Sequence, residues 1–179
     1  RNHSSAASDV YKRQNQDWTF PTTTYYGPGR FNEIGKFCEE FDIKNPLIVT
    51  DSGSKDLPFI KKLIALLSKK NIKSDLFYNI SPNPRDDEIS KGCDQFKNGS
   101  HDSIIAIGGG SAMDGGKSIC LTVNSETPLW DFEFEQPVPK ITKENAFPKI
   151  ITIPTTAGTG AETEITAMVT HLEKGMKFC

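Results

Sequence analysis

The stretch Ile104-Ile-Ala-Ile-Gly-Gly-Gly-Ser-Ala-Met-Asp-Gly-Gly-Lys117 decides the fold of this chain. Its first four residues are typical of a buried strand, and the three glycines after them allow a sharp turn and close approach of a ligand to the backbone. Ser111 is expected to open a helix, because Ser-x-x-Asp with Asp114 can cap free backbone amides. The remaining amides and the helix dipole suit a phosphate. A purely structural turn is the alternative interpretation.

Apolar runs on both sides of this stretch alternate with amphipathic segments. We expect strands at residues 18–26, 47–51, 73–78, 104–107, 150–153 and 164–170, and helices from residue 30, around 60–67, and over 86–97 and 112–123. This alternation predicts an α/β fold, with a parallel sheet flanked by helices on both faces. Residues 124–148, which contain four prolines, are expected to form a long connection outside the sheet, between the helix at 112–123 and the strand at 150–153.

Three groups of residues follow predicted strands directly. Asp51, Asn83 and the glycine turn at residues 108–111 each lie just past a strand end. Right-handed crossovers place the carboxyl ends of parallel strands along one edge of the sheet, where ligands bind in such folds. We therefore expect these groups to share one crevice.

The order of these groups differs from the ordinary dinucleotide fingerprint. In that fingerprint an acidic residue follows Gly-x-Gly-x-x-Gly by about 20 positions. Here the strand-end carboxylate, Asp51, comes well before the glycine turn. The chain is therefore predicted to be a Rossmann-like nucleotide-binding domain rather than a standard one.

Composition and charge narrow the class of protein. The net charge of −2 over 179 residues predicts no nucleic-acid partner and no anionic membrane surface. The four cysteines form no Cys-x-x-Cys pair, and no apolar run approaches the roughly 20 residues that span a bilayer. We expect a cytoplasmic protein. Residues 1–14 are predicted to be a disordered or non-native leader, followed by one α/β domain over residues 15–179.

Two motifs together resemble a known family. Gly-Gly-Gly-Ser-x-x-Asp-x-x-Lys, ending at Lys117, is followed by Pro-Thr-Thr-Ala-Gly-Thr-Gly-Ala-Glu at residues 154–162. In this order they closely resemble the iron-containing (group III) alcohol dehydrogenases, over about residues 19–178. The resemblance implies the N-terminal, nucleotide-binding half of such an enzyme, with the C-terminal helical metal-binding domain absent.

The resemblance also implies a set of cofactor-binding residues. Asp51 would lie near the adenosine ribose and repel a 2′-phosphate, which favours NAD over NADP; initiation of the Asp-Ser-Gly turn is the alternative role. Asp114 and Lys117 complete the phosphate motif, although a surface ion pair would also explain them. The full set expected at the cofactor is Asp51, Asn83, Gly109, Gly110, Ser111, Asp114, Lys117, Thr155, Thr156, Thr159 and Lys177.

The metal of the family is not expected in this chain. In relatives a divalent metal, which we expect to be iron, is held by one Asp and three His residues of the later half. His171 stands where many relatives carry an Asp, and neither His101 nor His171 has a two-ligand spacing. We assign no metal ligand and no catalytic residue here.

The expected function is NAD-dependent, metal-assisted hydride transfer between a primary alcohol and an aldehyde or ketone. This chain would supply the cofactor-binding half and be inactive alone, with a small alcohol or aldehyde as substrate and a homo-oligomer as the form of the complete enzyme. An enzyme of the glycerol dehydrogenase or dehydroquinate synthase type is an alternative. A non-catalytic nucleotide-binding module is another.

Overall fold

The computed structural model describes residues 22–137, 139–140 and 146–179. The predicted leader at residues 1–14 and the first part of the predicted strand at 18–26 lie outside these residues. Helices and strands alternate along the chain. In order they are η1 Arg30–Glu33, α2 Ile34–Glu40, β1 Pro46–Asp51, α3 Pro58–Ser68, β2 Asp75–Ile80, α4 Asp86–Asn98, β3 Ser103–Gly108, α5 Gly110–Thr122, η2 Leu129–Phe132, β4 Lys149–Pro154, β5 Val169–His171 and β6 Met176–Phe178.

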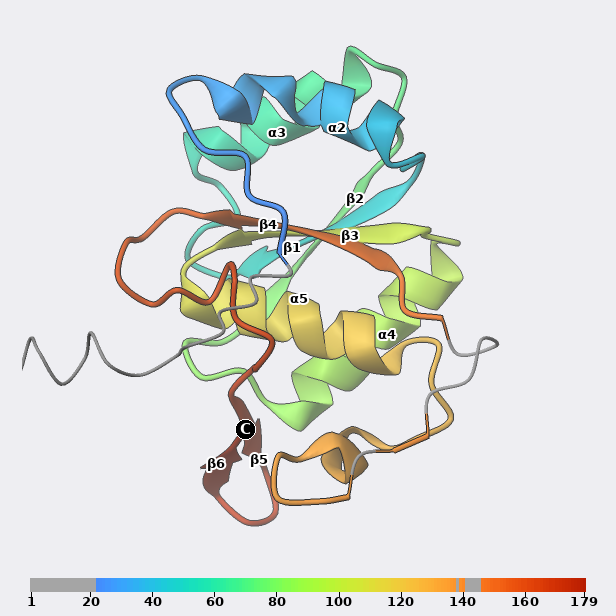
Figure 1. Ribbon diagram of the computed structural model, residues 1–179, viewed down its shortest axis with the longest axis vertical. Coiled ribbons are helices and arrows are strands. Elements are labelled where there is room, and N and C mark those ends of the chain that lie inside the picture. The colour runs from blue at the N-terminus through green and yellow to red at the C-terminus, as the bar shows by residue number, and fades with distance from the viewer. Residues whose placement is uncertain (1–21, 138, 141–145) are drawn as a thin grey trace, which may run out of the picture.

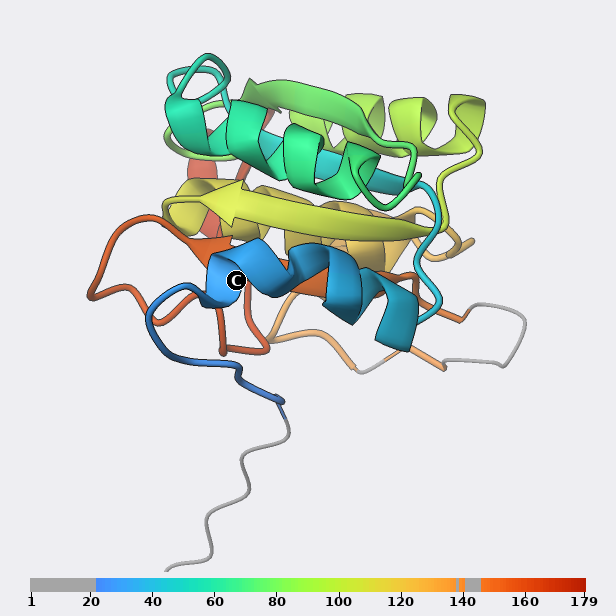
Figure 2. The same ribbon diagram turned by 90° about the horizontal axis from the view of Figure 1, so that it is seen from above.

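The main sheet has four parallel strands in the order β2-β1-β3-β4. Helices α2 and α3 cover one face, and α4 and α5 cover the other (Figure 1). Figure 2 shows the same layers from above, with α2 and α3 in front of the sheet, β3 visible between these two helices, and α5 behind β3. The expected fold class, a parallel sheet flanked by helices, is confirmed.

Two hydrophobic clusters hold the layers together, one on each face of the sheet. Successive strand residues point to opposite faces, so Leu47 and Ile104 join the cluster under α4 and α5, while Ile48 and Ile105 join the one under α2 and α3. All four side chains are fully buried. This two-sided burial is the physical reason why the strands are continuous apolar runs rather than alternating ones.

The ends of the chain depart from expectation. Residues 22–26, predicted as the end of a strand, are not a strand, because aromatic and threonine residues favour a strand only where a neighbouring strand pairs with them. The predicted strand at 164–170 shrinks to β5, which pairs antiparallel with β6 in a separate two-stranded ribbon. This ribbon lies beyond α5, away from the main sheet (Figure 1).

No helix among the described residues is both long enough and apolar enough to cross a lipid bilayer.

Candidate functional site

Gly108 ends β3 and turns the chain directly into α5. Its φ of 149° lies in the region that favours glycine. An added Cβ would stand 2.7 Å from the Cβ of Ala112 and 3.2 Å from Oδ2 of Asp51. The carbonyl of Gly108 accepts a hydrogen bond of 2.8 Å from the backbone amide of Thr155, at the start of the loop after β4. Gly108 therefore sets the geometry that brings the two motifs together.

The N-terminus of α5 carries no side-chain cap, so the predicted capping box is wrong. Gly109 is the residue before the helix, and no side chain accepts from the amides of the first turn. The Ser111 hydroxyl instead donates to the carbonyl of Pro82, after β2. Asp114 turns toward the backbone amide of Met168. The first-turn amides of α5 are therefore available to an external acceptor.

Helix α4, on the same face of the sheet, is capped by its own residues. Glu88 Oε2 accepts from the backbone amides of Arg85 and Ser81, each at 3.1 Å. Asp86 Oδ1 accepts from the amide of Asp87 at 2.9 Å. Helices α2 and α3 also begin without a side-chain cap, so α5 is distinguished by the glycine turn that precedes its open end.

The threonine loop, residues 155–166 between β4 and β5, faces the glycine turn. A Cβ added to Gly109 would lie 3.5 Å from Oγ1 of Thr156, and one added to Gly110 would lie 3.4 Å from Cγ2 of Thr159. Between the loop and α5 lies a depression of about 320 Å³, lined by Gly110, Ser111, Asp114, Thr159, Ala161, Glu164, Thr166 and Met168. The loop and the start of α5 lie at the same edge of the sheet (Figure 1).

Asp51, the last residue of β1, lies beside the glycine turn and also holds its own turn. Its carboxylate accepts from the backbone amide of Ser54 at 3.0 Å and from the Ser54 hydroxyl at 2.7 Å. The turn role considered from the sequence is therefore present. Each carboxylate oxygen retains an acceptor site, so a ribose contact remains a prediction alongside it.

Two expected residues lie at the margin of the site. Asn83 is exposed in the turn after Pro82, and its carbonyl accepts from the Ser81 hydroxyl at 2.8 Å. Lys177 is exposed on β6, within electrostatic reach of Asp114. For both residues, contact with a cofactor stays a prediction.

Asp114 and Lys117 are more buried than a surface ion pair. Asp114 Oδ1 lies 3.5 Å from Lys117 Nζ, and their side chains are 16% and 15% exposed. Burial raises the pKa of the Asp114 carboxyl above its usual value, although the Lys117 ammonium opposes this shift. The Lys117 ammonium donates to backbone carbonyls of the threonine loop, those of Ala161, Glu164 and Thr166.

Sequence reasoning missed two glycines that allow α5 to pack close to the strands of the sheet. A Cβ at Gly116 would stand 2.5 Å from the Cβ of Ala106, and one at Gly115 would stand 2.6 Å from Cδ1 of Ile80. Larger residues would push the helix away from β3 and β2. The signal was available, since paired glycines inside a helix indicate close packing.

The described residues do not fit a divalent metal. Among them no group of three His, Cys, Asp or Glu side chains lies close enough to hold one. His101 is bound through Nδ1 to the carbonyl of Asn45 at 3.0 Å, near the amino ends of the strands. His171 stacks on Trp130 in the ribbon, with ring centroids 4.5 Å apart.

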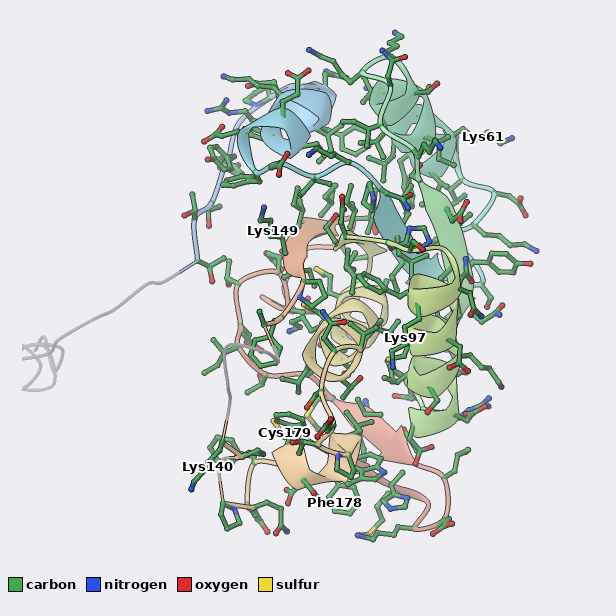
Figure 3. The ribbon with its side chains drawn as sticks, turned by 90° about the vertical axis from the view of Figure 1, so that its right-hand side faces the viewer. Lys61, Lys97, Lys140, Lys149, Phe178 and Cys179 are labelled. Carbon is green, nitrogen blue, oxygen red and sulfur yellow. The ribbon has the colours of Figure 1, made fainter. Side chains whose placement is uncertain are left out.

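A second hollow, which we call the apolar groove, lies between α5, η2 and the ribbon. Its volume is about 400 Å³, and it is lined mainly by apolar side chains that include Trp130, Phe132, Phe134, Phe147, Ile165 and Phe178. Figure 3 labels Phe178 and Cys179, which lie next to η2.

The doubly covered parallel sheet and the open glycine turn at its carboxyl edge define a Rossmann-like α/β domain. The family model described as iron-containing alcohol dehydrogenase matches residues 21–179. The chain belongs to this family. The expected family is thereby confirmed.

Individual relatives agree with this assignment. The 1,3-propanediol dehydrogenase of Klebsiella pneumoniae is 29% identical, over 90% of this chain and 41% of its own. The crystal structure of a 1,3-propanediol oxidoreductase superposes with a TM-score of 0.82 at 28% identity, over 92% and 42% of the two chains. The sulfoacetaldehyde reductase of Bifidobacterium kashiwanohense, solved in complex with NAD+, superposes at 0.80 and 26% identity, over 92% and 42%. The chain thus spans about two fifths of their length.

Proposed function

We propose that this chain forms the NAD-binding part of an enzyme that interconverts a primary alcohol and an aldehyde or ketone. The observation that carries the proposal is the uncapped first turn of α5, which directly follows Gly108 and faces Thr156 and Thr159. Such a helix end offers amides and a positive dipole to a pyrophosphate. The bound NAD+ in one relative, and family membership, support the choice of ligand.

The described residues fit NAD at three places. The amides of Gly110 and Ser111 would receive the pyrophosphate, where the lack of side chains at Gly109 and Gly110 lets the phosphates approach. Exposed Thr155, Thr156 and Thr159 would donate from the facing loop. Asp51 would accept from the ribose hydroxyls and disfavour a 2′-phosphate. When bound, NAD supplies the hydride acceptor.

Substrate and metal are proposed from the family. A small alcohol or aldehyde is the proposed substrate, and iron, held by residues other than those described, is the proposed metal. The described residues present no group of three side chains that could hold this metal. What this chain contributes is the binding and orientation of the nucleotide.

Two neighbouring glycines provide the experiment that tests nucleotide binding. Gly109 has φ −78° and ψ −176°, which any residue adopts, so Gly109→Val should fold and lose at least about tenfold in NAD affinity, or about 1.4 kcal/mol. Gly108→Ala should instead lower the free energy of unfolding by about 1–3 kcal/mol, because its φ is positive. Calorimetric titration with NAD and urea unfolding separate the two effects. Unchanged NAD binding by folded Gly109→Val would contradict the proposal.

A further inference from the structure

Lys117 projects from the second turn of α5 across to the threonine loop. Its ammonium donates to the carbonyl of Ala161 at 3.0 Å, to that of Glu164 at 3.3 Å, and to that of Thr166. A lysine ammonium has three N–H donors and no acceptor. All three donors are therefore directed at backbone carbonyls of one loop.

These contacts leave little capacity for a ligand. The Lys117 side chain is 15% exposed, and Asp114 provides the nearby negative charge at 3.5 Å. To pair with a phosphate, the ammonium would have to release carbonyls in a half-buried place, and an unpaired buried polar group is costly.

The threonine loop depends on few other anchors. Its first residue, Thr155, donates its amide to Gly108, and Thr152 Oγ1 on β4 donates to the carbonyl of Glu162 at 2.8 Å. The Thr22 hydroxyl donates to the carbonyl of Thr163 at 3.3 Å, and Ala161 is buried in the core. The residues that face the glycine turn, Thr156 and Thr159, are exposed. Irregular exposed segments of this kind open at low free energy unless side chains hold them.

We propose that Lys117 is a positioning residue that acts on the nucleotide only through the threonine loop. By holding the carbonyls of Ala161, Glu164 and Thr166, it keeps Thr156 and Thr159 opposite the glycine turn. A larger fraction of chains then has a formed nucleotide cleft, and the apparent dissociation constant falls in proportion. The inference rests on the proposed NAD site but makes a separate prediction for the chain without nucleotide.

The test compares Lys117→Met and Lys117→Arg with the control Lys97→Met. Lys97 is exposed on α4, outside the site, and is labelled in Figure 3. In the absence of nucleotide, amide hydrogen exchange of residues 155–168 should be about tenfold faster in Lys117→Met than in the wild-type chain. The dissociation constant for NAD should be about tenfold higher in the same variant. Lys117→Arg should retain much of the loop's protection from exchange and much of the NAD affinity, since a guanidinium keeps several donors. The control Lys97→Met should match the wild-type chain in loop exchange, NAD affinity and urea midpoint.

Two results would overturn the inference. Weaker NAD binding with unchanged loop exchange would make Lys117 a direct ligand, and faster exchange with unchanged NAD affinity would show that the loop position is irrelevant. If Lys117→Met fails to fold, amine labelling of the wild-type chain still decides, because equal labelling of Lys117 and Lys97 would rule out the carbonyl contacts. A wild-type chain that binds no NAD would contradict the proposed function. The comparison of loop exchange between the wild-type chain and Lys117→Met would still test whether Lys117 holds the threonine loop.

Discussion

At the scale of single residues, the three glycines of the turn differ in what they do. Gly108 is required by the backbone, since its φ is positive and a Cβ would meet Ala112 at 2.7 Å. Gly109 and Gly110 have room for a Cβ at ordinary contact distances from Thr156 and Thr159. Their lack of a side chain therefore leaves the space in front of the helix open, which is what a ligand needs.

Asp51 tests the choice between NAD and NADP. Asp51→Asn keeps an acceptor for the Ser54 amide but removes the charge that would repel a 2′-phosphate. We expect the preference for NAD to narrow by about tenfold or more, or about 1.4 kcal/mol. Titration of both cofactors measures it, with Ser54→Ala as the control that disturbs the turn and keeps the carboxylate. An unchanged preference would remove Asp51 from the ribose site.

Asp114 predicts a dependence of stability on pH. Burial raises its pKa above 3.8 in the folded chain, so just above that pH the folded chain retains a proton that the unfolded chain releases. The free energy of unfolding should therefore decline as pH rises from about 4 through the raised pKa. Asp114→Asn should lack this decline in urea unfolding at a series of pH values. Asp94→Asn, at an exposed position of α4, should retain the wild-type slope.

At the scale of elements, the ribbon of β5 and β6 is held by one carboxylate of α4. Asp86 Oδ2 accepts from Nε1 of Trp130 at 3.2 Å and from the backbone amide of Leu172 at 3.4 Å, and His171 Nδ1 lies 3.5 Å away. The Thr170 amide also donates to the carbonyl of Pro84. The first turn of α4 thus fixes the ribbon that brings Met168 and Lys177 to the site.

Trp130 tests this attachment. Trp130→Phe keeps an aromatic ring to stack on His171 but removes the donor to Asp86. We expect the free energy of unfolding to fall by about 1 kcal/mol, with faster amide exchange confined to the ribbon and η2. Asp131→Asn, at the exposed neighbouring position, is the control. Equal exchange in Trp130→Phe and the control would show that the hydrogen bond does not hold the ribbon.

At the scale of the whole molecule, the site and the apolar groove are neighbouring hollows that share Thr166 but differ in chemistry. The site is built from loops at the carboxyl edge of the sheet, with polar groups directed inward. The groove lies behind α5, where Phe134 is 77% exposed and Ile165 is 88% exposed. Clustered apolar exposure of this kind marks a surface that favours association.

The groove therefore predicts concentration-dependent self-association of the isolated chain. Replacing two exposed groove residues outside the threonine loop, Phe134→Ser with Phe147→Ser, should shift sedimentation toward the monomer and leave NAD affinity within about twofold, because neither residue lines the site. Leu57→Ser, at a 42% exposed position before α3, is the matched control. Association that is unchanged in the double variant would assign it to another surface.

Much of the architecture could be predicted from the sequence because it depends on local signals. Apolar runs such as 104–107 and helical periodicity predict strands and helices, and alternation of the two predicts a parallel sheet. The glycine turn and Asp51 follow strands, so their shared edge is predictable as well. The two motifs were enough to indicate the family that the comparisons confirm.

Only the tertiary structure determined which hydrogen-bond partners the polar side chains of the site have. Ser111 and Asp114 look like a capping pair in the sequence, but Ser111 donates to Pro82 and Asp114 turns toward Met168. Lys117 similarly binds carbonyls 44 to 49 residues further along the chain. A side chain with several possible partners takes those that packing brings within reach, and packing depends on contacts between distant parts of the chain. Local spacing therefore determined the elements and the edge that carries the site, whereas long-range packing determined which residues hold that site in shape.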